Sequence, residues 1–120
     1  MSMFKVNVVA VNPVKPDMAT VPVEALVDTG YELTWMPKDA LAAAGIQPVR
    51  KRTFQTATKQ IIQREIGYAI LRAEGYETND EVVFAESGDM NLLGVRTLEG
   101  FGVAVDNIGH RFVAQAMMVV

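Results

Sequence analysis

Short stretches in which apolar and polar residues alternate recur along the 120-residue chain. This period of two is typical of β-strands that bury one face. The first such stretch, residues 4–11, alternates apolar residues with Lys5 and Asn7. The whole pattern predicts seven or eight strands, most of them at 4–11, 20–27, 33–36, 49–56, 61–73, 81–85 and 103–106, with an apolar tail at 112–120.

Two short helices interrupt the strands. Pro37 suits the first turn of a helix over 38–44, the alanines there favour helix, and Gly45 follows where a helix end is expected. A second helix is predicted around 95–101. The predicted fold class is therefore all-β, or mainly β with two short helices. Because no linker or change in composition divides the chain, residues 1–120 are expected to form a single domain.

The strands at 49–56 and 61–73 are close enough in the chain to form a hairpin. Along the second strand, the even-numbered residues from Ile62 to Ile70 are apolar except for Arg64, which predicts one buried face. The predicted tip of the hairpin consists of Ala57, Thr58, Lys59 and Gln60.

Composition excludes several classes of function. The net charge of −3 gives no electrostatic footprint for nucleic acid, and the absence of cysteine excludes thiol catalysis and cysteine-bound metal. The single histidine, His110, has no catalytic spacing around it, and the acidic residues form no calcium-binding pattern. No cofactor or metal is expected. No stretch resembles a signal peptide or a membrane helix, so we expect no membrane contact and a cytoplasmic location.

One short motif, Asp28-Thr29-Gly30, follows an apolar stretch and occurs once in the chain. Asp and Gly are common where a strand ends, so the tripeptide alone indicates an ordinary turn. A carboxylate that follows a buried strand is costly, however, unless it is hydrogen-bonded or shares a proton. Two such carboxylates held together cannot both ionise, so that one is an acid and the other a base that activates water.

The region around this motif resembles the active-site loop of retroviral-type, or retropepsin-like, aspartic proteases. Leu26-Val27 precedes the motif, and Thr34 and Pro37 follow it as in that family. A second family signature, two apolar residues and a glycine before a helix, is present at Leu92, Leu93 and Gly94. The likeness is greatest to the small bacterial and archaeal members (clan AA), in which a later strand ends in Val-Asp as at Val105-Asp106.

The resemblance implies a closed, barrel-like β fold that works as a homodimer and hydrolyses peptide bonds in a peptide or protein substrate without a cofactor. Asp28 would be the catalytic acid and base, one from each subunit. Thr29 would form contacts between the two loops, and Gly30 would let the substrate approach. The hairpin tip at 57–60 would be the flap that covers the substrate, and the apolar tail 117–120 would join a sheet between subunits.

The chain departs from the family in the residue after the motif, which is usually small but is Tyr31 here. Its phenol would either narrow the cleft or hydrogen-bond the substrate. Glu32 adds an acid nearby, and the flap tip has Thr58-Lys59 where a glycine is usual. These departures leave open an inactive dimer of the same fold that binds peptides or serves as a scaffold. A further alternative is a monomeric β-barrel that binds a small ligand, with Asp28 as an ordinary turn residue.

Overall fold

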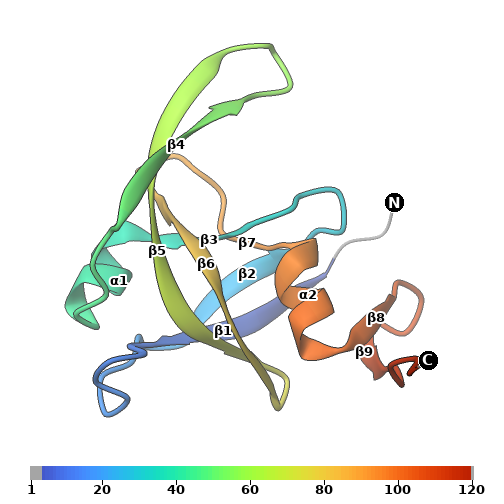
Figure 1. Cartoon of the computed structure of the whole chain (residues 1–120). Coiled ribbons are helices and arrows are strands. Elements are labelled where there is room, and N and C mark those ends of the chain that lie inside the picture. The colour runs from blue at the N-terminus through green and yellow to red at the C-terminus, as the bar shows by residue number, and fades with distance from the viewer. Residues whose placement is uncertain (1–3, 120) are drawn as a thin grey trace.

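The computed structural model describes residues 4–119 and confirms a mainly β fold with two short helices (Figure 1). The helices lie where the sequence predicts them, and β5 has its predicted bounds. The elements of this part of the chain are β1 (Lys5–Val11), β2 (Val23–Val27), β3 (Thr34–Pro37), α1 (Lys38–Ala43), β4 (Arg50–Gln55), β5 (Ile61–Ala73), β6 (Tyr76–Ala85), β7 (Leu92–Leu93), α2 (Val95–Phe101), β8 (Val103–Asp106) and β9 (Arg111–Ala114).

Six of the strands form a closed ring. Their order is β1-β2-β7-β3-β6-β5, and an antiparallel pairing between β1 and β5 joins the two ends. Two of the pairings are parallel: β2 with β7, and β3 with β6. The parallel pairing of β2 with β7 places Leu26 opposite Leu92 and Val27 opposite Leu93. The Asp28-Thr29-Gly30 motif, which follows β2, and Gly94, which follows β7, therefore lie next to each other at the same edge of the ring.

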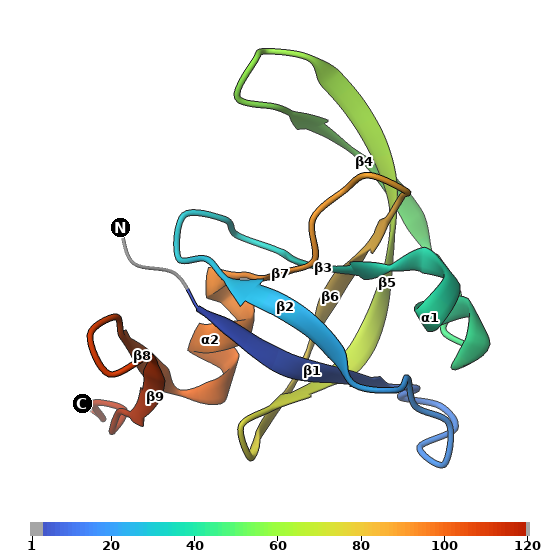
Figure 2. The same ribbon diagram turned by 180° about the vertical axis from the view of Figure 1, so that it is seen from behind.

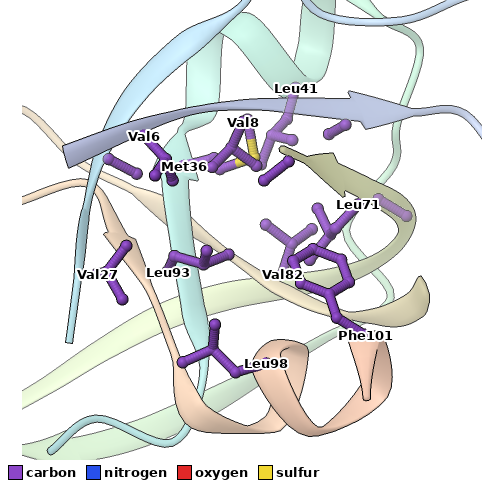
Figure 3. Packing of buried hydrophobic residues seen from close by; sticks show 14 of the residues in the cluster. Val6, Val8, Val27, Met36, Leu41, Leu71, Val82, Leu93, Leu98 and Phe101 are labelled. Atoms are coloured by element: carbon purple, nitrogen blue, oxygen red, sulfur yellow. The ribbon is translucent and has the colours of Figure 1, made fainter. Parts of the chain in front are cut away.

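The hydrophobic core fills the inside of this ring (Figure 3). Each helix adds a buried leucine, Leu41 from α1 and Leu98 from α2, and the last residue of α2, Phe101, is also buried. Burial of such side chains contributes about 1.5–3 kcal/mol each. The strand residues labelled in Figure 3 are Val6, Val8, Val27, Met36, Leu71, Val82 and Leu93.

The long strand β5 changes its buried face at Gly67, which differs from the single even-numbered face predicted for it. Before the glycine, Ile66 packs in a small second cluster with Leu33 and Val83. After it, Leu71 on the odd-numbered face enters the main core, whereas Tyr68 is half exposed. A Cβ at Gly67 would lie only 2.7 Å from the backbone oxygen of Gln47. The absence of a side chain at Gly67 therefore lets β5 pass close to the segment that contains Gln47.

The predicted hairpin is present and stands out from the ring (Figures 1 and 2). Strands β4 and β5 pair from Arg50↔Ile66 to Gln55↔Ile61, and β4 has no second partner strand in the described part of the chain. At the tip, the Lys59 amide donates to the Thr56 oxygen at 2.8 Å, and Lys59 has a positive φ of 65°. A lysine thus occupies the left-handed position that a glycine usually fills.

The C-terminal part differs from the prediction of one long apolar tail. Strand β9 ends at Ala114 and pairs with β8 in a separate two-stranded sheet. Phe112 packs this sheet against the rest of the molecule, since its ring centroid lies 6.1 Å from the ring centroids of both Phe4 and Phe101. Residues 115–119 form no strand, and the side chains of Met117 and Met118 are almost fully exposed. Val120 of the predicted tail lies outside the described residues.

Strand β6 also begins earlier than predicted, at Tyr76 instead of residue 81. Its first half, residues 76–80, is mostly polar and lacks the apolar alternation that marks a strand in a sequence. Pairing with β5 over the whole length, from Ala73↔Tyr76 to Ile66↔Val83, satisfies its backbone groups. The strand is therefore defined by its neighbour more than by its own residues.

Candidate active site

Asp28 directly follows β2 and is 8% exposed in the single chain. Its amide donates to the Leu93 oxygen at 3.1 Å, and the amide of Val27 donates to the Phe4 oxygen at 2.8 Å. Strands on both sides of β2 thus hold the backbone at the point where the carboxylate emerges. The sheet therefore fixes the backbone of Asp28, and the acidic side chain is nearly buried there instead of exposed in a surface turn.

The carboxylate of Asp28 is held by its own loop. Its Oδ1 accepts a hydrogen bond from the Gly30 amide at 2.9 Å, and the Tyr31 amide donates to the Asp28 carbonyl at 3.3 Å. A Cβ on residue 30 would lie 3.1 Å from the same Oδ1, so a glycine lets the loop fold back closely. Thr29 and Gly30 are both exposed. They lie at the surface beside the carboxylate, where the sequence places the active-site loop.

The second motif supports this loop from the side. A Cβ at Gly94 would lie 2.5 Å from the Leu33 carbonyl oxygen, so only glycine allows the contact. The first amides of α2 complete it, since Val95 donates to the Tyr31 oxygen at 2.8 Å and Arg96 to the Glu32 oxygen at 3.0 Å. The N-terminus of α2 therefore satisfies two carbonyl groups of the loop, while the loop satisfies helix amides that would otherwise lack partners.

A groove of about 430 Å³ lies between this loop and the hairpin. Trp35 from the ring and Phe54 from the hairpin both line it and contact each other, with ring centroids 5.0 Å apart. Of the predicted substrate-binding residues, Tyr31 and Ala57 line the groove, whereas Thr58, Lys59 and Gln60 form the hairpin tip beyond it. Its apolar lining is Leu33, Trp35, Phe54, Ile62, Met90 and Leu92.

An ion pair fixes the base of the hairpin to the loop that closes the groove. Arg64 of β5 donates from Nε to Asp89 Oδ2 at 2.7 Å and from Nη2 to Oδ1 at 2.9 Å, and both side chains are only 16–17% exposed. The hydrogen bond from Arg64 holds the pKa of Asp89 below its ordinary value of 3.8, against the effect of burial. The Glu86 amide, at 2.8 Å, lowers this pKa further.

Several contacts that support the site give no signal in the sequence. Two arginines of β4, Arg50 and Arg52, and Arg96 of α2 surround the mostly buried Glu81, and Arg52 also lines the groove. The buried threonines Thr34 and Thr97 likewise meet across 63 positions of sequence. The sequence does not predict these contacts, because they join residues far apart in the chain and depend on the folded ring.

Residues 4–119 contain neither a metal-binding cluster nor a membrane-spanning helix. Within them, no group of three His, Asp or Glu side chains is placed to hold a metal ion. None of the helices in this part of the chain is long and apolar enough to cross a membrane.

The closed ring, the paired motifs and the overhanging hairpin define the class of retropepsin-like aspartic proteases. The chain belongs to the family described as gag-polyprotein putative aspartyl protease, whose model matches residues 14–100 and therefore more than half of the chain. The match includes Asp28 and Gly94, and it confirms the family that the sequence motifs indicate. No curated protein matches the chain at a significant level.

Proposed function

We propose that the protein is an aspartic endopeptidase that works as a homodimer, with one Asp28 from each subunit at the active site. The observation that carries this proposal is the environment of Asp28. Its Oδ1 is bound by the Gly30 amide, while its Oδ2 accepts no hydrogen bond from residues 4–119. With a single Asp-Thr-Gly in the sequence, the second carboxylate of a dyad comes from another copy of the chain.

The chemistry follows from the closeness of two carboxylates. When they face each other, repulsion keeps one of them protonated while the other stays ionised. The ionised group takes a proton from a water molecule between them, and the water attacks the peptide carbonyl. The protonated group donates to the carbonyl oxygen as negative charge develops there. The C–N bond then breaks as the first Asp28, which now carries the proton from water, gives that proton to the leaving nitrogen. Catalysis by this route needs only the two Asp28 side chains and water.

The groove supports a peptide substrate in an extended conformation. Strand β4 has no second partner strand among residues 4–119, so its free edge gives a strand-like partner for the substrate backbone. The Trp35–Phe54 pair provides an apolar surface for a substrate side chain. The hairpin then acts as a flap that excludes water when the substrate is bound, with residues 57–60 at its tip.

The surface around the site supports the dimer. Thr29 and Gly30 are exposed beside a nearly buried carboxylate, so a second loop can approach them directly. The almost fully exposed Met117 and Met118 are apolar, and within residues 4–119 strand β9 has no partner other than β8. Pairing between two copies covers both features. We further propose that residues 1–120 act as one domain in the cytoplasm.

A second candidate, an inactive dimer that binds peptides, is favoured by Tyr31. Its side chain is 51% exposed and lines the groove next to the catalytic loop, where a phenol occupies space that a substrate would use. Such a protein would hold an extended peptide without cleaving it.

Comparison of the wild type with Asp28→Asn on an unfolded protein substrate, from acidic to neutral pH, separates the two candidates. The endopeptidase is expected to cleave, and the variant is expected to lose at least about a hundredfold in rate because a dyad cannot form. Peptide binding without cleavage by either protein would favour the scaffold. Equal cleavage by both proteins would exclude Asp28 as the catalyst.

A further inference from the structure

A chain of buried hydroxyl groups joins the second motif to a carboxylate on β6. The Gly94 amide donates to Thr34 Oγ1 at 3.0 Å, Thr34 Oγ1 lies 2.6 Å from Thr97 Oγ1, and Thr97 donates to Asp80 Oδ2 at 2.9 Å. The two threonines are fully buried, and the side chain of Asp80 is 6% exposed. Buried polar groups are costly without partners, so these contacts are specific features of the fold.

The carboxylate gives this chain of hydrogen bonds one direction. An ionised carboxylate only accepts hydrogen bonds, so the Thr97 hydroxyl donates its single proton to Asp80. Thr97 must then accept from Thr34, and Thr34 in turn accepts from the Gly94 amide. The other carboxylate oxygen of Asp80 accepts from the Glu81 amide at 2.8 Å and lies 3.7 Å from the Arg96 guanidinium. Every partner of Asp80 is thus a donor.

The residues at the far end of this chain of hydrogen bonds hold the catalytic loop. Gly94 lies between Leu93, whose oxygen accepts from the Asp28 amide, and Val95, whose amide donates to the Tyr31 oxygen. A shift of Gly94 therefore moves both supports of the loop. Thr34, Thr97 and Asp80 do not line the groove, so such a shift reaches the substrate only through the loop.

We propose that Asp80 and Thr97 are positioning residues for Asp28, acting through Thr34 and Gly94. This inference rests on the proposed function and extends it to residues outside the groove. Loss of the Thr97 hydroxyl leaves the Thr34 proton without its acceptor and frees Gly94 to move. Misplacement of a catalytic group by about 1 Å costs up to a hundredfold in rate. The larger effect is expected on kcat, because Asp28 moves with the loop while most of the groove lining, including Trp35 and Phe54, stays in place.

Three variants test the direction of the hydrogen bonds. Thr97→Val keeps the shape of the side chain but removes the hydroxyl, whereas Thr97→Ser keeps the hydroxyl. Asp80→Asn places an amide NH2 against a donor in either orientation, facing Thr97 or the Glu81 amide. The matched control is Thr20→Val, because Thr20 is also buried and accepts from the Ala10 amide at 3.0 Å, near the end of β1 away from Asp28.

The first measurement is kcat and KM on a peptide that spans a cleavage site mapped in an unfolded protein. The second is amide hydrogen exchange in each variant. We expect Thr97→Val and Asp80→Asn to lower kcat at least about tenfold with KM within about twofold, and Thr97→Ser to keep most of the rate. We also expect faster exchange at residues 94–96 and 28–31 in the first two variants. In Thr20→Val these rates should equal those of the wild type.

Unchanged kcat and unchanged exchange in Thr97→Val would overturn the proposal, as would an equal loss of kcat in Thr97→Ser. If the wild type cleaves nothing, the proposed function fails, and the exchange data alone decide whether Asp80 and Thr97 position the loop. Faster exchange limited to the loop and the start of α2 then supports the positioning role. Exchange that is unchanged there, or equally altered in Thr20→Val, overturns it.

Discussion

At the scale of single residues, hydrogen bonds to neighbouring groups hold Asp28 in place. The amide of Asp28 is bound to Leu93, and its Oδ1 is bound to the Gly30 amide. Since the loop holds one oxygen in place, the other points in a fixed direction, as a dyad between two identical chains requires. The glycine favours this arrangement because a Cβ there would lie 3.1 Å from the bound oxygen, which would then have to shift by a few tenths of an ångström.

Gly30→Ala is therefore expected to impair catalysis without unfolding the protein. The added methyl group displaces the Asp28 carboxylate, and we expect kcat/KM to fall at least about tenfold. The free energy of unfolding should change by no more than about 1 kcal/mol, because residue 30 is exposed. Peptidase assays and urea denaturation measure the two effects.

Gly75→Ala is the control, with the opposite expectation. Gly75 has a φ of 84° in the turn between β5 and β6, and no atom would contact its Cβ. Alanine there costs about 1–2 kcal/mol of stability from the left-handed backbone but leaves the rate unchanged. A normal rate in Gly30→Ala would contradict the proposed role of the Asp28–Gly30 contact.

At the scale of elements, the Arg64–Asp89 pair connects the hairpin to the loop between β6 and β7. The lowered pKa of Asp89 makes this connection depend on pH. Because the folded protein holds this pKa below its ordinary value of 3.8, the pair contributes its full stability above that pH. The contribution is lost as the pH falls through the lower pKa of the folded state, when the carboxylate takes up a proton.

Asp89→Asn is expected to destabilise the protein by about 1–3 kcal/mol at pH 7, since the mostly buried Arg64 loses its charged partner. The difference from the wild type should shrink as the pH falls below 3.8, because the wild-type carboxylate is then neutral too. Urea denaturation at several pH values measures it. The control Glu77→Gln breaks the exposed pair with Arg72 and should cost at most about 1 kcal/mol. A difference that stays constant with pH would contradict this assignment.

Elements with a strong local signal could be predicted from the sequence. The first helix has Pro37 before it and Gly45 after it, and Gly45 has the left-handed φ of 72° that ends a helix. The bounds of β5 and α2 and the pairing of the hairpin strands also agree with the structure. Asp28 and Gly94 were recognised by their motifs, and the ring places these motifs next to each other.

Features that depend on long-range contacts could not be predicted. The polar start of β6 is a strand because β5 pairs with it, and the tail stops being a strand at Ala114, where pairing with β8 ends. Asp80 lies in that polar start and has the pattern of a surface residue, yet the ring brings it to Thr97. The supports of the site are therefore visible only in the folded chain.

At the scale of the whole molecule, a single chain leaves apolar surface uncovered. Met117 and Met118 are almost fully exposed and follow β9, which in the described part of the chain pairs only with β8. A second copy of the chain covers them in the proposed dimer and brings the second Asp28. Dimer formation and activity should then have the same dependence on protein concentration.

The double variant Met117→Asp and Met118→Asp is expected to weaken the dimer at least about tenfold, because it places charges in a buried apolar contact. Sedimentation should give more monomer at low concentration, and activity should recover as the protein concentration rises. The control is Val14→Asp, which alters a similarly exposed apolar residue in the loop after β1. An unchanged dimer in the double variant would show that the tail lies outside the interface.

The central claim is that two chains each give one Asp28 to the same site, and a mixing experiment tests it most directly. Wild type and Asp28→Asn are unfolded together in equal amounts, refolded, and assayed at constant total protein. Random pairing leaves about one quarter of the dimers with two aspartates, so activity should be about one quarter of the wild-type value. Activity of about one half, as expected when each chain works independently, would contradict the claim.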